Sequence, residues 1–148
     1  MIKSHQNTTH RIDHADQLLV DAIENHVMQL SEFTHQNHVK LAYCYLVQFG
    51  LSASSKIITR SLKSFLKAKG VDANKFHVTL TEAWLKAVWY FMQLSPACQS
   101  SESFLENSPM LLNKDLLLSH YSHELLFSEC ARKHYVEPDL SAFPIAFH

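Results

Sequence analysis

Apolar residues recur three and four positions apart in four long stretches of the chain, which is the pattern of amphipathic helices. The first stretch predicts a helix that is capped by Asp13 or Asp16 and runs to about Leu30. The second predicts a helix over 35–49, with Thr34 as its N-cap and the preceding phenylalanine as the outer half of a hydrophobic staple.

A third helix is expected over 54–69, because apolar positions again repeat at helical spacing there. Gly50 and Gly70 are the only glycines in the chain, and each falls where a helix is expected to stop. So few glycines argue against tight hairpins and phosphate-binding loops, and they exclude a Rossmann or P-loop nucleotide fold.

The fourth helix is expected to end at Leu94, before a Ser-Pro pair, and two starting points are open for it. Either Asn74 caps it directly, or Thr79 and Glu82 form a capping box further along. Two tryptophans, a tyrosine and a phenylalanine lie in this stretch, which predicts the most buried helix of the fold.

Short helical pieces and an extended tail are expected after residue 95. The pieces lie at 102–106, 114–120, 123–127 and 129–135, and their caps are predicted to be Ser101, Asn113, Ser122 and Ser128. The tail carries four large apolar residues that should pack on the bundle: Leu140, Phe143, Ile145 and Phe147. The predicted fold is all-α, a four-helix core with short C-terminal helices and an extended C-terminal strap.

Length and composition narrow the class of protein. The chain has 148 residues, 47% of them hydrophobic, which suits a single helical domain over 1–148 with a flexible polar lead-in at 1–11. No run of 18 apolar residues occurs and the N-terminus has no apolar segment, so we expect no membrane span, no secretion signal and a cytoplasmic location. Three widely separated cysteines support neither a disulfide framework nor a zinc ribbon.

The formal net charge is −1 with neutral histidines, so no global field attracts nucleic acid. One basic stretch stands out: Lys56, Arg60, Lys63, Lys67 and Lys69. Its members recur mostly at helical spacing, which is typical of a solvated helix face, and they lack the interleaved aromatic residues of base contacts.

Histidines are the candidate chemistry, because the chain contains eleven of them. Those nearest the ends of the chain are expected to be solvated: His5, His10, His14 and His148. His35 and His38 lie one helical turn apart, and His77 stands near the start of the fourth helix. Three imidazoles with an open position suit divalent zinc, iron, copper or nickel, and the positive end of a helix dipole favours the neutral ring that binds metal.

The sequence therefore predicts a histidine-lined pocket in which His35, His38 and His77 bind a divalent metal ion. Tyr45 and Thr81 are the residues predicted to orient a small-molecule substrate, if the protein is an enzyme. The same helix starts present free backbone N–H groups, which also suit a small anion without metal.

A further alternative is a non-catalytic interaction domain that contacts a protein partner through the basic third helix or the strap. The histidines would then be structural, with His38 packed on Phe33, and the sequence leaves a homo-oligomer open.

Two motifs around these histidines resemble a group of short, uncharacterised bacterial proteins. The motifs are F-T-H-x-x-H-V-x-x-A-x-x-Y-L over 33–46 and F-H-V-T-L-T-x-x-W over 76–84, and the segments 121–122 and 136–140 are similar as well. The resemblance covers most of the chain from about Leu30 and implies that the three histidines act as a unit. It implies no activity, since none is established for the group. An acidic residue often follows the third histidine in that group, whereas this chain has Val78.

Overall fold

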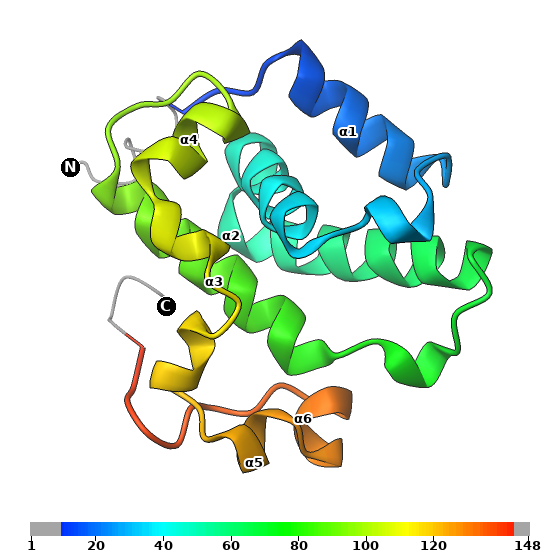
Figure 1. The fold of residues 1–148 in the computed structure, drawn as a ribbon, viewed down its shortest axis with the longest axis vertical. Coiled ribbons are helices and arrows are strands. Elements are labelled where there is room, and N and C mark those ends of the chain that lie inside the picture. Colours follow the sequence, from blue (N-terminus) through cyan, green and yellow to red (C-terminus); the bar gives the residue numbers. More distant parts are fainter. Residues whose placement is uncertain (1–9, 144–148) are drawn as a thin grey trace.

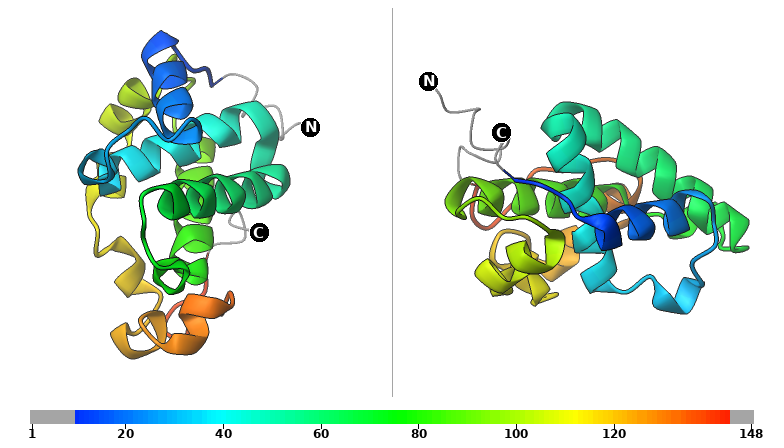
Figure 2. Two further views of the ribbon diagram at one scale, coloured as in Figure 1. Left: turned by 90° about the vertical axis from the view of Figure 1, so that its right-hand side faces the viewer. Right: turned by 90° about the horizontal axis from the view of Figure 1, so that it is seen from above.

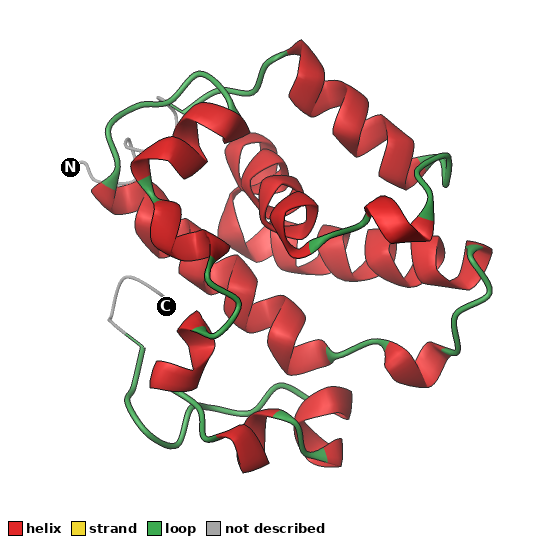
Figure 3. Cartoon of the chain, in the orientation of Figure 1, coloured by secondary structure: helices red, strands yellow, loops and turns green. Residues whose placement is uncertain are grey.

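Helices make up the regular structure of residues 10–143, the part of the chain that this computed structural model describes, and that part contains no strand (Figures 1 and 3). The described α-helices are α1 (His14–Glu24), α2 (His35–Ala68), α3 (Val78–Leu94), α4 (Ser101–Asn107), α5 (His123–Leu126) and α6 (Glu129–Lys133). Short 3-10 helices connect them: η2 (Leu30–Glu32), η3 (Ala73–Lys75), η4 (Pro109–Leu112) and η5 (Leu116–Ser119). The predicted all-α class is confirmed.

Helices α2 and α3 form the centre of the fold. Helix α1 packs on α2, and α6 packs on α3, as the two rotated views in Figure 2 also show. The interior is filled by large side chains such as Ile23, Tyr43, Leu46, Phe65 and Leu85, all at most 1% exposed. No described helix is both long and apolar enough to cross a membrane.

Helix α1 begins where the sequence predicts and ends earlier. Asp13 caps it and forms a capping box with Asp16. The helix stops at Glu24 rather than near Leu30, because His26 adopts a left-handed φ of 62° that turns the chain away. Val27, which continues the apolar stripe of the sequence, is therefore 72% exposed instead of buried.

Helix α2 joins the predicted second and third helices with a kink between them. Thr34 caps it as predicted, accepting a hydrogen bond from the Asn37 N–H at 3.3 Å. Gly50 has φ 77° and ψ 176°, so the helical path breaks at that residue as expected. The chain re-enters the helix directly after Gly50, earlier than the expected start at Ser54, and Figure 1 shows the two halves running in different directions.

The N-cap of α3 is neither of the two predicted residues. His77 occupies it, and its Nδ1 accepts a hydrogen bond from the Leu80 N–H at 3.0 Å. Asn74 lies in η3, while the Thr79 hydroxyl donates to the His134 carbonyl at 2.9 Å and ties the C-terminal segment to α3. The imidazole already satisfies the helix start, which leaves Thr79 for a tertiary contact.

Residue His10 is buried, contrary to the expectation that the terminal histidines are solvated. It is 3% exposed, and its Nε2 donates to the Met92 carbonyl at 2.9 Å. The Tyr43 hydroxyl donates to the Arg11 carbonyl at 2.7 Å. The last two residues of the predicted lead-in are thus anchored to the core, and residues 1–9 lie outside the described part.

The short C-terminal helices form close to their predicted positions. Ser122 and Ser128 cap α5 and α6 as expected, but Ser100 rather than Ser101 caps α4, because the Ser101 hydroxyl donates to buried Asp16 instead. In the strap, the Leu140 N–H donates to the His120 carbonyl at 2.8 Å. Phe143 is 5% exposed whereas Leu140 is 60% exposed, so only one of these two packs as predicted. Ile145 and Phe147 lie outside the described residues.

Candidate functional site

His35 is held by a backbone carbonyl at the start of α2. Its Nε2 lies 2.9 Å from the Leu111 carbonyl oxygen, which can only accept, so Nε2 carries the proton and donates. The ring stands edge-on to Trp84 with 4.5 Å between ring centres. His35 therefore links α2 to α3 and η4.

His38 lies one turn further along α2, packed against an aromatic ring. Its centre is 5.8 Å from that of Phe33, the packing that the structural alternative expects. Nε2 is covered and has no hydrogen-bond partner in the described part of the protein. Burial, and secondarily the nearby His35, lowers the pKa of His38 to about 4, so the ring is neutral at physiological pH.

His77 uses both ring nitrogens. Nδ1 caps α3, and Nε2 donates to the Leu126 carbonyl at 2.8 Å. Burial lowers its pKa, because the protonated form would lose the solvation it has in water, and protonation would also remove the acceptor that caps the helix. His77 thus fastens α5 to the start of α3.

These three histidines are not gathered as ligands of one ion. Among residues 10–143, no three His, Cys, Asp or Glu side chains are grouped in a way that could hold a metal ion. Ligation through Nε2 would require His35 and His77 to give up their carbonyl partners. Metal binding stays a prediction of the sequence, which elemental analysis of untagged protein tests: stoichiometric zinc, iron, copper or nickel, lost in His38→Ala, would support it.

The two residues predicted to orient a substrate form internal hydrogen bonds. Tyr45 is 1% exposed, and its hydroxyl lies 2.6 Å from the Glu24 carboxylate and 3.0 Å from the Ser61 hydroxyl. Burial, followed by the bond to Glu24, raises the pKa of the Tyr45 phenol. The Thr81 hydroxyl donates to the His77 carbonyl at 2.8 Å, one turn back along α3. The Tyr45 hydroxyl therefore links α2 to α1, and the Thr81 hydroxyl stabilises the first turn of α3.

A row of exposed cations runs along the C-terminal half of α2. The row comprises Lys56, Arg60, Lys63 and Lys67, spaced four, three and four residues apart on one helix face. The ion pairs found within residues 10–143 are those of Glu129 with Arg132 and Lys133, so none of them joins a carboxylate to this row; Glu24 lines a surface pocket together with Arg60 without forming an ion pair. Lys69 differs, because its Nζ donates to the His26 carbonyl at 2.9 Å.

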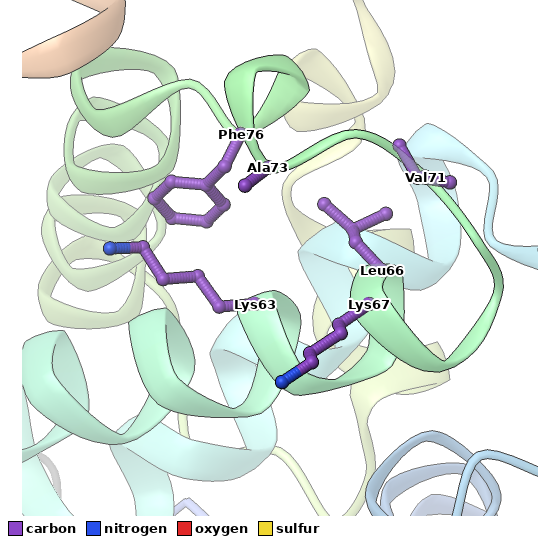
Figure 4. Close-up of a pocket in the computed structure, with 6 residues that line it drawn as sticks. All are labelled: Lys63, Leu66, Lys67, Val71, Ala73 and Phe76. Carbon is purple, nitrogen blue, oxygen red and sulfur yellow. The ribbon is translucent and has the colours of Figure 1, made fainter.

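An apolar pocket adjoins two members of this row, at the turn between α2 and η3. Its cavity of about 370 Å³ is lined by Lys63, Leu66, Lys67, Val71, Ala73 and Phe76. Figure 4 shows Lys63 and Phe76 on one side and Leu66 and Val71 on the other. The Lys63 Nζ stands 5.2 Å from the centre of the Phe76 ring, a cation–π contact.

The sequence predicts the row of cations on α2 but not the pocket beside it. The recurring lysines are visible as a basic stretch, whereas the pocket needs the turn after Gly70 to bring η3 back over the end of α2. Phe76 follows η3 as its C-cap and closes the pocket.

In comparisons with known proteins, no family model, no curated protein and no solved structure matches this chain. The resemblance to the bacterial group therefore stays an expectation.

Proposed function

We propose that this protein is a non-catalytic interaction domain that binds an acidic segment of a protein partner on the basic face of α2. The basic face is defined here as Lys56, Arg60, Lys63 and Lys67. The observation that carries the proposal is that these four exposed cations share one helix face and that no described carboxylate pairs with them.

The length of the basic face favours a chain segment over a small ion. Lys56 and Lys67 are eleven residues apart, which is about 16 Å at 1.5 Å per residue of helix. An extended acidic segment of five or six residues spans the same distance at about 3.3 Å per residue. A single phosphate or carboxylate would meet only one or two of the cations.

Nucleic acid fits the surface less well than an acidic peptide. Only one of the four cations is an arginine, the side chain best suited to bidentate phosphate contacts. The face carries no aromatic residue between its cations on which a base could stack. The net charge of −1 also gives no overall attraction to a polyanion.

Selection from a library of random twelve-residue peptides tests the proposal. The wild-type protein should enrich sequences in which aspartate and glutamate predominate. The double variant Lys63→Glu/Lys67→Glu should lose this enrichment, whereas Lys114→Glu, which changes an exposed lysine outside the basic face, should keep it. Enrichment of basic peptides, or an unchanged selection by the double variant, would refute the proposal.

A further inference from the structure

The pocket between α2 and η3 combines an apolar interior with two ammonium groups. Leu66, Val71 and Phe76 supply aliphatic and aromatic surface, while Lys63 and Lys67 stand at its edge as the last two members of the basic face (Figure 4). Asp72 is the only carboxylate between the first and last residues of the pocket lining in the sequence. Its side chain accepts a hydrogen bond from the Asn74 N–H at 2.9 Å and caps η3.

The pocket interior is suited to a side chain rather than to a second helix. Its volume of about 370 Å³ lies at the lower end of the range of roughly 300–1,000 Å³ found for ligand pockets. A surface pocket of that size takes one or two large apolar groups. Such pockets are where binding energy concentrates in protein interfaces, since a buried aromatic or aliphatic anchor is fully removed from water.

We infer that this pocket takes a large apolar side chain that stands directly beside carboxylates in the partner's segment. The inference rests on the proposed function and adds the specificity that the basic face lacks. Exposed ion pairs each contribute little free energy and distinguish poorly between acidic sequences. The apolar anchor makes the partner motif an acidic one with a phenylalanine, leucine or similar residue at a fixed place.

The position of Lys63 supports this pairing of charge and apolar surface. Its Nζ lies 5.2 Å from the centre of the Phe76 ring, so the cation–π contact favours a position of the ammonium group beside one wall of the pocket. A carboxylate next to an inserted side chain would meet Lys63 on one side and Lys67 on the other. Charge complementarity at the mouth and apolar contact inside therefore select the same segment.

Titration of the ¹⁵N-labelled full chain with three blocked pentapeptides tests the inference. The first has phenylalanine at the centre of four glutamates, the second has alanine at the centre, and the third has phenylalanine among four lysines. Amide chemical shifts yield dissociation constants even for weak complexes. The first peptide should bind at least about tenfold more tightly than the second, because only it buries a ring. Shifts at Leu66, Val71 and Phe76 should accompany the first peptide alone.

Two variants separate the anchor from the charges. Ala73→Phe places a ring in the pocket from η3 and leaves all four cations, so it should abolish the preference for phenylalanine but keep weak binding of the acidic alanine peptide. Leu66→Ala weakens the same preference without filling the space, which protects the test if Ala73→Phe folds poorly. Lys114→Gln, outside the pocket and the basic face, should bind all peptides as the wild type does.

The outcomes of these titrations distinguish the apolar anchor from the proposed function. Equal binding of the two acidic peptides refutes the anchor and leaves the proposed function standing. No binding of either acidic peptide, or equal binding of the lysine peptide, refutes both. Decanoate, a free amphipathic carboxylate, is the last comparison. If it changes the amide chemical shifts of the pocket residues while no acidic peptide binds, the pocket takes a free carboxylate instead, and the inference is also overturned.

Discussion

At the scale of single residues, the histidines act as connectors between elements. His77 caps α3 with Nδ1 and holds the Leu126 carbonyl with Nε2, and His35 holds the Leu111 carbonyl in the same way. Two of the three histidines predicted as metal ligands, His35 and His77, are therefore committed to hydrogen bonds across the fold, whereas the Nε2 of His38 has no hydrogen-bond partner within residues 10–143.

Substitution of His77 should separate its two contacts. His77→Ala removes the cap, which costs about 1 kcal/mol, and leaves the Leu126 carbonyl without its donor, which costs about 1 kcal/mol more. His77→Asn keeps an acceptor for the Leu80 N–H but is too short to hold Leu126, so it should lose about half as much. Urea unfolding measures both free energies. Equal losses in the two variants would show that the cap contributes nothing.

His38, whose Nε2 has no hydrogen-bond partner within residues 10–143, predicts a loss of stability in acid. The unfolded chain binds a proton at His38 near pH 6.5, whereas the folded chain resists protonation until about pH 4. Because the unfolded state takes up the proton first, the free energy of unfolding should fall as the pH drops from about 6.5 towards 4. His38→Gln cannot titrate, so urea midpoints measured at pH 7 and pH 5 should differ less in this variant. A midpoint change as large as that of the wild type would contradict the assignment.

Local sequence patterns predicted helix caps only where the cap is one of the usual residue types. Asp13, Thr34, Ser122 and Ser128 cap helices as expected, because a short oxygen-bearing side chain next to an apolar repeat is a direct local signal. His77 was not expected as a cap, since capping rules favour Ser, Thr, Asp and Asn. Its role depends on the distant Leu126 carbonyl, which no local pattern contains.

At the scale of elements, the kink in α2 depends on one backbone conformation. Gly50 has φ 77° and ψ 176°, a region open essentially to glycine alone. A Cβ at this position would meet no atom within 4 Å, so any cost of adding one comes from the backbone and not from crowding. Gly50→Ala should therefore lower the free energy of unfolding by about 1–3 kcal/mol. An unchanged or higher melting temperature would show that the kink is not under this constraint.

The strap contributes stability mainly through one ring in the described residues. Phe143 is buried beside Tyr121, and the Asp139 carboxylate accepts hydrogen bonds from both the N–H and the hydroxyl of Ser122. Truncation after Pro138 should lower the free energy of unfolding by at least about 2 kcal/mol, the scale of one large buried side chain. Leu140→Ala, at an exposed position, is the matched control and should leave the melting temperature nearly unchanged. Equal melting of truncated and full chains would refute the packing role.

Helix periodicity predicted which segments are helical but not where every helix stops. The apolar stripe of the first helix continues through Val27, yet the chain leaves the helix at Asn25 because His26 turns it and bonds to the distant Ser64 hydroxyl at 2.9 Å. An apolar repeat predicts which residues would share a face if the helix continued. It does not predict a tertiary contact that ends the helix.

At the scale of the whole molecule, the position of charge matters more than its sum. The net charge is −1, but four cations share one face of α2 beside an apolar pocket. The sequence revealed the basic repeat, since spacing along one helix is local. It could not reveal the pocket or the hydrogen bonds of His35 and His77, because both depend on how segments far apart in the chain pack together.

Salt should weaken peptide binding without changing the preference for an apolar anchor. The basic face attracts glutamates through exposed charges, and raising the sodium chloride concentration from 50 mM to 500 mM shortens the screening length to well under 10 Å. The dissociation constant of the phenylalanine–glutamate peptide should therefore rise several-fold over this range. Burial of its ring against Leu66 and Phe76 does not depend on charge, so the ratio of its affinity to that of the alanine–glutamate peptide should stay nearly constant. Fluorescence anisotropy of dye-labelled peptides measures both quantities, with Lys63→Gln expected to reduce the salt dependence. A ratio that falls together with the affinity would mean that the ring adds nothing of its own and that charge alone governs binding at this surface.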